Sequence, residues 1–229
     1  MFLLKTAPMA LTLRVLSRLL AYPAAPLRGH FGEMRAALQR EQALSAARLA
    51  EIDALISSIE QQSAIDAEAD YVQLFDSGRS TSLLLFEHVH GDSRDRGPAM
   101  IDLAQTYEKA GLFLGAGEMP DHLPVVLEYA STQPAREARA FLGEMVHILN
   151  AIFNALDKRG SRYASVLGAL IELAGEKARQ VNVADDEAID EAWAEPAAFD
   201  GCASGGQSRP GQPQPIHIVR PAAEPGARA

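Results

Sequence analysis

FLGEMVHILNAIFNAL, residues 141–156, is the stretch that decides the fold class. Its apolar residues fall three and four positions apart, which is the spacing of one face of an α-helix. These residues are Phe141, Leu142, Met145, Ile148, Leu149, Ile152, Phe153 and Leu156. Pro134 precedes the stretch and Gly160 follows it, and both residue types are typical of helix boundaries, so we predict one long helix between them.

The same spacing recurs on both sides of this helix, and sustained alternation with period two occurs nowhere. Further apolar stripes run through residues 11–20, 27–38, 44–59, 66–75, 100–110 and 163–171. Pro120–Pro124 opens one more helix, for which Asp121 is the expected N-cap. We therefore predict an all-α, single-domain helical bundle of about 8–10 helices over residues 1–175.

The composition limits the classes of partner. The chain of 229 residues is 48% hydrophobic and has a formal net charge of -9, which argues against nucleic acid because phosphate binding depends on Lys and Arg. The single cysteine, Cys202, rules out an intramolecular disulfide and fits a cytoplasmic protein. The longest uncharged run, residues 145–156, is well short of the ~20 apolar residues of a membrane span, so we expect no membrane insertion.

The character of the chain changes after Gly175. Residues 176–200 form an acidic segment with eight acidic and two basic residues. Residues 201–229 are rich in Gly and Pro and show no apolar periodicity, so we predict a disordered C-terminal tail. A lone Trp193 in the acidic segment could dock on the domain or on a partner, or simply lie near a poorly ordered terminus.

Signatures of enzymes are missing from the sequence. It has no phosphate-binding loop, and the GAG of residues 115–117 lacks the third glycine of a dinucleotide site. His88 and His90 are the best metal candidates, with Asp92 or Asp95 nearby. Two residues two positions apart on a helix point in different directions, and no second cluster completes four ligands, so we predict no metal site and no enzyme.

The segment LLLFEHVHGDSRDRG, residues 83–97, joins four apolar residues to two histidines and five charged residues. Its charges alternate in sign with those of Asp76 and Arg79, which favours a loop tied down by Arg–carboxylate pairs. One interpretation is a charged loop that merely holds two helices together. The other is a rigid frame for a peptide groove, in which apolar contacts give affinity and charges give register.

YVQLFDSGRSTSLLLFEHVHGDSRDRGPAM, residues 71–100, resembles the signature of the NarJ family, the assembly chaperones of respiratory nitrate reductase. EMPDHLPVVLEY, residues 118–129, is similar to a second family element, with Met119 where leucine is commoner. SRLLAYP (residues 17–23) and SRYASVL (161–167) also fit, and the resemblance spans roughly residues 10–200. Within the wider group of redox enzyme maturation proteins, it is this family that the chain resembles.

The resemblance implies an all-α cytoplasmic chaperone without a cofactor of its own. It implies binding to the apo catalytic (alpha) subunit of nitrate reductase, chiefly to its N-terminal peptide. The subunit would thereby stay competent for insertion of the molybdenum cofactor before it docks on the membrane. Molybdenum cofactor delivery proteins are further candidate partners.

Under this reading the peptide lays its apolar face in a groove, and acidic residues face its basic residues. The candidate groove residues are Tyr71, Leu74, Phe75, Phe86, Tyr107, Leu123 and Leu127, although core packing explains each of them equally well. The candidate acidic contacts are Asp76, Glu87, Asp92, Asp95 and Asp121. The residues expected to order the loop are Arg79, His88, His90, Arg94 and Arg96.

Three alternatives stay open at this point. The chain could be a peptide-binding chaperone for another molybdoenzyme, although the residues 86–97 speak against it. It could be a metal-dependent hydrolase that uses His88 and His90. It could also be a structural helical adaptor.

Overall fold

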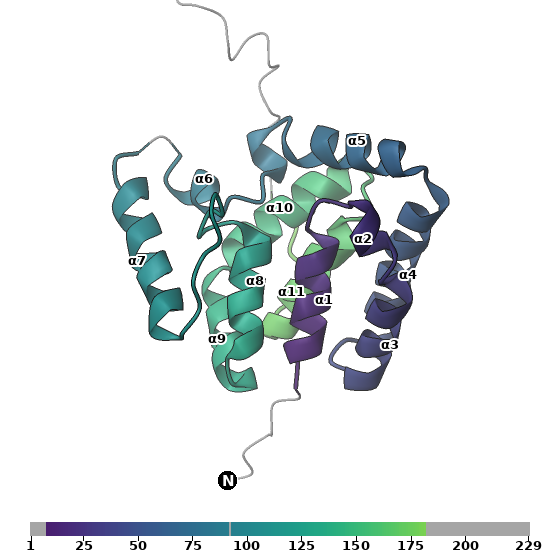
Figure 1. The fold of residues 1–229 in the computed structure, drawn as a ribbon, viewed down its shortest axis with the longest axis horizontal. Coiled ribbons are helices and arrows are strands. Elements are labelled where there is room, and N and C mark those ends of the chain that lie inside the picture. The colour runs from purple at the N-terminus through teal and green to yellow at the C-terminus, as the bar shows by residue number, and fades with distance from the viewer. Residues whose placement is uncertain (1–7, 92, 182–229) are drawn as a thin grey trace, which may run out of the picture. The chain divides into compact units, whose positions relative to one another are not determined.

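The computed structural model describes residues 8–91 and 93–181 (Figure 1). Within these residues the chain forms eleven α-helices, one 3-10 turn and no strand, so the all-α prediction is confirmed. The helices are α1 (Ala10–Leu19), α2 (Ala25–Arg28), α3 (Phe31–Glu41), α4 (Ala46–Gln61), α5 (Ala64–Phe75), α6 (Leu85–Val89), α7 (Arg96–Lys109), α8 (Leu123–Thr132), α9 (Ala135–Glu144), α10 (Val146–Lys158) and α11 (Ala164–Ala174). The 3-10 turn η1 spans Arg79–Thr81.

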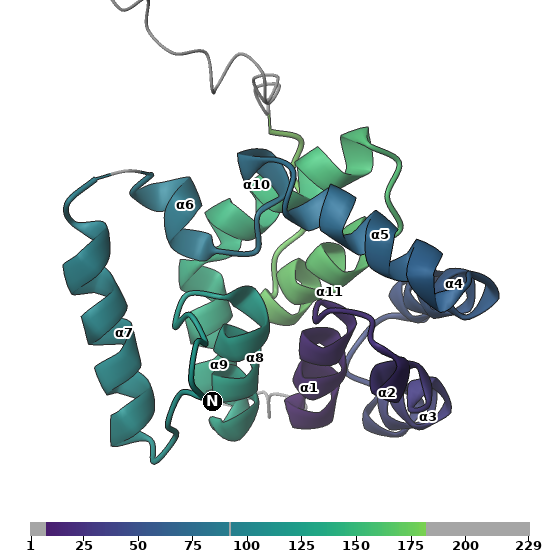
Figure 2. The ribbon, with the colours of Figure 1, turned by 45° about the horizontal axis from the view of Figure 1, so that its top comes forward.

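Helix α11 lies at the centre of the core. Nine of its eleven residues are buried, because the helix is apolar on nearly every side. Helices α10, α9, α4 and α1 all contact it, and the two views show it enclosed by these neighbours (Figure 1, Figure 2). It ends at Gly175, whose φ of 87° is the left-handed conformation that glycine adopts without strain.

Helices α1 and α8 lie side by side across the front of α11 (Figure 1). Their contact includes a buried polar link, in which the hydroxyl of Ser17 donates to the carbonyl oxygen of Pro124 at 2.8 Å. At the other end of α1, the carboxylate of Glu41 accepts from the backbone N–H groups of Leu11 and Thr12 at 3.1 and 2.6 Å. Glu41 thus satisfies orphan donors of the first helical turn from a different helix.

The predicted long helix of residues 134–160 is wrong in one respect, because it is two helices. The chain turns at Met145, where φ is -94° and ψ is -1°, and α9 ends while α10 begins. Gly143, a poor helix former, precedes this turn. The break lets α9 and α10 pack on α11 along separate directions.

The eleven helices of the described residues agree with the predicted bundle of about 8–10, and the additional ones are the short α2 and the second half of the divided helix, α10. Leu11, expected on the core stripe of the first helix, is instead 36% exposed. The acidic segment is described only as far as residue 181, and the predicted tail of residues 201–229 and Trp193 lie outside the described residues. In the described part of the chain, no helix is long and apolar enough to cross a membrane.

Candidate functional site

The charged segment is fixed by pairing with the segment that precedes α8. The backbone N–H of Leu123 donates to the carbonyl of Leu83 at 2.8 Å, and that of Leu85 donates to the carbonyl of Asp121 at 3.0 Å. Leu84 and His122 thereby form an isolated antiparallel bridge. Two stretches about 38 residues apart in the sequence therefore meet at one place and set where α6 begins.

Asp121 is the polar centre of this junction, and its predicted role as the N-cap of α8 is wrong. His122 occupies that N-cap position without a side-chain hydrogen bond. The Asp121 carboxylate instead accepts from the backbone N–H of Phe86 at 3.0 Å, so it caps the start of α6. Pro124, which lacks an N–H group, reduces the need for a cap on α8 itself.

Asp121 is 0% exposed, and its Oδ1 atom has no hydrogen-bond partner among the residues that the structure describes. Burial raises the pKa of this carboxyl above its usual range, while the hydrogen bond from Phe86 and the nearby Arg96 guanidinium act in the opposite direction. Burial also lowers the pKa of the neighbouring His122. Both groups therefore favour their uncharged forms more than they would in water.

The two histidines of the H-x-H pair have separate surroundings. The Nε2 atom of His88 lies 2.9 Å from the carbonyl oxygen of Ser82, one turn back along the loop. The ring of His90 packs edge-on against Phe86, with centroids 5.3 Å apart. In residues 8–91 and 93–181, no group of three His, Cys, Asp or Glu side chains is placed to hold a metal ion.

Glu87 and Arg96 join α6 to the start of α7. Their side chains form an ion pair of 3.7 Å, and each is about a quarter exposed. Asp95 bonds locally, because its carboxylate accepts from the hydroxyl of Ser93 at 3.2 Å. The structure thus brings Glu87, Arg96 and Asp121 close together around the base of α6.

The other predicted charged residues stand at the end of α5, in η1 and in the turn before α7. Asp76 follows α5 as its exposed C-cap residue, and Arg79 begins η1. Arg94 is exposed in the turn before α7. Asp92 lies outside the described residues. Contact of any of these residues with a peptide stays a prediction.

Most of the predicted groove residues lie in the core. Leu123 and Leu127 are 0% exposed, so a peptide could reach them only if α8 moved away from its neighbours. Tyr71 and Phe75 are buried in an aromatic cluster with Tyr163, and the hydroxyl of Tyr71 donates to the carbonyl oxygen of Leu20 at 2.7 Å. Leu74 and Phe86 are half-buried, so these two keep some surface.

Tyr107 links the predicted site to a hollow that sequence reasoning missed. It is the one buried residue of α7. Its ring packs 4.9 Å from that of Tyr129, and its hydroxyl donates to the carbonyl oxygen of Pro120 at 2.8 Å. The rest of α7 stands at the edge of the bundle, with Ile101 59% exposed (Figure 2).

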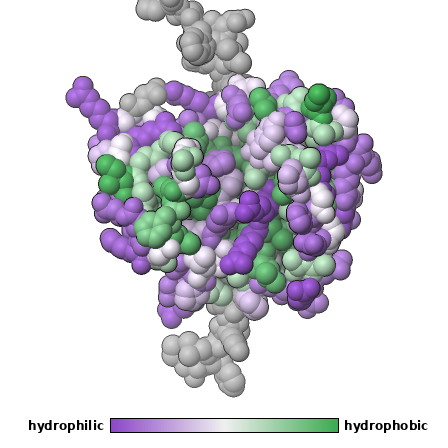
Figure 3. Space-filling view, viewed as in Figure 1, coloured by the Kyte–Doolittle hydropathy of each residue, from purple (hydrophilic) through white to green (hydrophobic). Residues whose placement is uncertain are grey.

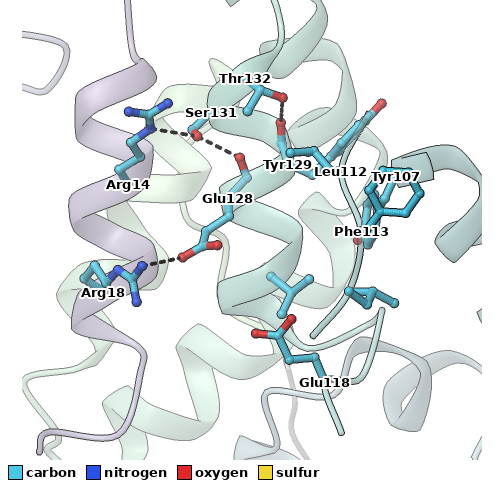
Figure 4. A pocket seen from close by; sticks show the side chains of 12 residues that line it. Arg14, Arg18, Tyr107, Leu112, Phe113, Glu118, Glu128, Tyr129, Ser131 and Thr132 are labelled. Atoms are coloured by element: carbon cyan, nitrogen blue, oxygen red, sulfur yellow. Dashed lines mark hydrogen bonds and ion pairs between the residues drawn. The ribbon is translucent and has the colours of Figure 1, made fainter. Parts of the chain in front are cut away.

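The hollow has a volume of about 380 Å³ and lies between α1, α8 and the connection after α7 (Figure 4). We call it the apolar hollow. Its lining residues are Arg14, Arg18, Tyr107, Leu112, Phe113, Leu114, Glu118, Val125, Glu128, Tyr129, Ser131 and Thr132. Phe113 at its rim is 80% exposed, which is unusual for a phenylalanine.

Arg14, Arg18, Glu128 and Ser131 form a polar wall of the apolar hollow between α1 and α8, and Glu118 stands apart from them on the connection before α8 (Figure 4). Arg18 and Glu128 form an exposed ion pair of 3.1 Å, and the Nε of Arg14 donates to the hydroxyl of Ser131 at 3.3 Å. In the same view as Figure 1, polar and apolar surface lie next to each other over α1 and α8 (Figure 3). An apolar floor beside a polar wall suits an amphipathic helix or peptide.

A second hollow of about 570 Å³ lies between α4, α5 and the α10–α11 turn. It includes the half-buried Leu74, but Asp70, Arg159 and Arg162 also line it. The guanidinium of Arg159 is bonded to Thr81 at 3.0 Å and to Ser80 at 3.3 Å. This hollow is more polar, so the apolar hollow is the better candidate for an apolar ligand face.

Comparison with known proteins shows which family the chain resembles. A model of the family described as nitrate reductase delta subunit matches residues 37–168. The nitrate reductase molybdenum cofactor assembly chaperone NarJ of Escherichia coli (strain K12) is 43% identical over 180 residues, which cover 77% of this chain and 76% of that protein. NarJ of Bacillus subtilis (strain 168) is 28% identical over 171 residues, which cover 73% of this chain and 90% of that protein.

The fold is that of the helical redox enzyme maturation proteins. A crystal structure of a protein assigned to that group, from Archaeoglobus fulgidus, aligns with a TM-score of 0.51 and 20% identity over 73% of this chain and 94% of that one. Within this class, the chain belongs to the nitrate reductase delta subunit family, which includes the NarJ proteins. The resemblance on which the expectations above rest is thus confirmed.

Proposed function

We propose that this protein is a chaperone, and not an enzyme, for the catalytic subunit of a respiratory nitrate reductase. It holds the apo subunit in a state that accepts the molybdenum cofactor, acts in the cytoplasm, and leaves before the subunit docks on the membrane. The observation that carries the proposal is the 43% identity to Escherichia coli NarJ over 77% of the chain. Cofactor delivery proteins are further candidate partners.

The N-terminal peptide of the catalytic subunit is the proposed ligand. The apolar hollow offers its apolar face a floor, with Phe113 exposed at the rim. Glu87 on α6 and Asp95 in the turn before α7 are the acidic residues proposed to attract basic residues of the peptide. The formal net charge of -9 adds a long-range attraction for a basic peptide.

Calorimetry tests this proposal with a synthetic peptide that copies the N-terminus of the catalytic subunit from the same host. We expect saturable one-to-one binding that weakens at higher salt concentration, because salt screens the charges. Phe113→Ala should weaken binding by about 1–2 kcal/mol through lost apolar contact. Ile65→Ala is the matched control, since Ile65 is 76% exposed on α5 and lies outside the apolar hollow.

Two results would count against the proposal. If the folded protein does not bind this peptide, the chain has the fold of the family but the N-terminal peptide of the catalytic subunit is not its ligand. If Phe113→Ala and Ile65→Ala bind the peptide as tightly as the unsubstituted chain, the peptide binds elsewhere than in the apolar hollow.

A further inference from the structure

Two asparagines on α10 hold the backbone of another part of the chain. The N–H of Arg179 donates to Oδ1 of Asn150 at 2.8 Å, and the carbonyl oxygen of Arg179 accepts from Nδ2 of Asn154 at 2.8 Å. Asn150 and Asn154 are four residues apart, so both side chains lie on one helix face. We call them the Asn clip, and we call residues 175–181 the strap.

The Asn clip imitates a neighbouring β-strand. In an extended chain the N–H and the C=O of one residue point to the same side, and an antiparallel partner strand pairs with both. Here one side-chain acceptor and one side-chain donor replace that partner strand. The recognised feature is therefore the N–H and the C=O of a single residue.

The α10 helix itself sets which amide atom each asparagine presents. Nδ2 of Asn150 donates to the carbonyl of Val146 at 3.0 Å, so its Oδ1 is turned outward as an acceptor. Nδ2 of Asn154 donates to the carbonyl of Asn150 at 2.7 Å, and its second proton serves the strap. With the strap in place Asn150 and Asn154 are 4% and 6% exposed, and their bonds to the carbonyls of Val146 and Asn150 hold both amide groups in the orientation that the strap uses.

The start of the strap is held by α11, because the N–H groups of Gly175 and Glu176 donate to the carbonyl oxygens of Glu172 and Ile171 at 2.9 and 3.1 Å. Every residue from Gly175 to Val181 is exposed, and within the described residues the side chain of Arg179 pairs with Glu176, at 3.2 Å. The strap runs from the end of α11 back past α10 (Figure 2). Its side chains contribute nothing to the contact with the Asn clip, so another extended segment can make the same two hydrogen bonds.

We propose that the Asn clip is a binding site for an extended, unfolded polypeptide segment, and that the strap occupies it until such a segment takes its place. The site is indifferent to side chains and excludes proline at the clipped residue, because proline has no N–H group. This goes beyond the proposed function, in which an amphipathic peptide is bound through its apolar face. The two sites lie on different elements, α10 here and α1 with α8 there.

The first test concerns the strap in the unsubstituted full chain. Hydrogen exchange followed by NMR should show the Arg179 amide exchanging several-fold more slowly than the amides of Ala178 and Gln180. Asn150→Leu should remove this difference, and Gln39→Leu, an exposed amide on α3, should leave it unchanged. Equal exchange of all three amides in the unsubstituted chain would overturn the proposal.

The second test uses the peptide GEKARQV, which copies residues 175–181, at millimolar concentration. Arg179→Pro in the full chain removes the clipped N–H and opens the site, while the exposed strap leaves folding unaffected. The side-chain amide resonances of Asn150 and Asn154 should then shift on peptide addition. The apparent affinity of the Arg179→Pro chain for GEKARQV should be at least tenfold higher than that of the unsubstituted chain. In the unsubstituted chain the strap competes with the peptide at a high effective concentration.

The control peptide GEKAPQV has proline at the position that corresponds to Arg179. It is added to the same Arg179→Pro chain, so no further substitution in the protein is needed. We expect it to leave both asparagine resonances unmoved. If it shifts them as strongly as GEKARQV does, or if neither peptide shifts them in the Arg179→Pro chain, the Asn clip is not a backbone-binding site. Because no client peptide is used, these results are independent of the test of the proposed function.

Discussion

The carboxylate of Asp121 accepts a hydrogen bond from the backbone N–H of Phe86 at 3.0 Å, and this bond joins the two family motifs. The first motif supplies the donor at the start of α6, and the second supplies the buried acceptor. Leu85 adds a backbone bond to the carbonyl of Asp121 at 3.0 Å. The position of α6, and with it the α6–α7 connection, therefore depends on Asp121.

Asp121→Ala should lower the free energy of unfolding by about 1–3 kcal/mol, because the partly buried N–H of Phe86 loses its partner. Asp121→Asn keeps an acceptor and should cost less. Urea denaturation measures both values. Asp102→Ala on α7 is the control, since Asp102 is exposed on the surface of that helix. Equal stability of the Asp121→Ala and Asp102→Ala chains would show that the cap contributes nothing.

The raised pKa of Asp121 predicts a specific dependence of stability on pH. Because the folded chain holds this proton more tightly than the unfolded chain does, the contribution of the group is complete below its unfolded pKa. It is lost as the pH rises through the higher folded pKa. The free energy of unfolding of the unsubstituted chain minus that of Asp121→Asn should therefore fall from about pH 4 upward. A difference that rises with pH over this range contradicts the predicted direction.

The sequence predicts contacts between residues that are near each other in the chain better than contacts between residues that are far apart in it. Helical spacing predicted the core residues Leu123 and Leu127, and it also made them look like groove residues, because a stripe does not say which neighbour covers it. The role of Asp121 was assigned to the nearest helix, whereas its partner Phe86 is 35 residues away. The turn at Met145 was missed because the apolar stripe continues through it. Both α9 and α10 pack on α11, so both keep apolar residues on the side that faces it.

The binding features were harder to predict than the core. Phe113 follows a helix end in an apolar run that suggests burial, yet it is 80% exposed. Asn150 and Asn154 could have been singled out from the sequence. Asparagine is a poor helix former, and two asparagines four residues apart lie on the same face of a helix, which suggests a role other than forming the helix. Their ligand, the backbone of Arg179, leaves no mark in the sequence.

Gly175 is expected to tolerate no side chain. Its φ of 87° disfavours other residues, and a Cβ atom would meet the guanidinium of Arg139, which would have to move away. Gly175→Ala should therefore lower the free energy of unfolding by about 1 kcal/mol or more. Gly143→Ala in α9 is the matched control, since nothing lies within 4 Å of its Cβ position. It should raise stability by roughly 0.5–1 kcal/mol, and thermal unfolding of both variants distinguishes the two signs.

Tyr107 fastens α7 to the bundle by two separable contacts. Tyr107→Phe removes only the hydrogen bond to the carbonyl of Pro120 and should cost about 0.5–1.5 kcal/mol of stability. Tyr107→Ala also removes the ring that packs on Tyr129 and should cost about 3–5 kcal/mol. Because Tyr107 is the one buried residue of α7, the alanine variant should show faster hydrogen exchange throughout α7 while α11 stays protected. If α7 and α11 lose protection together, α7 unfolds only with the whole domain, and its attachment does not depend on Tyr107 alone.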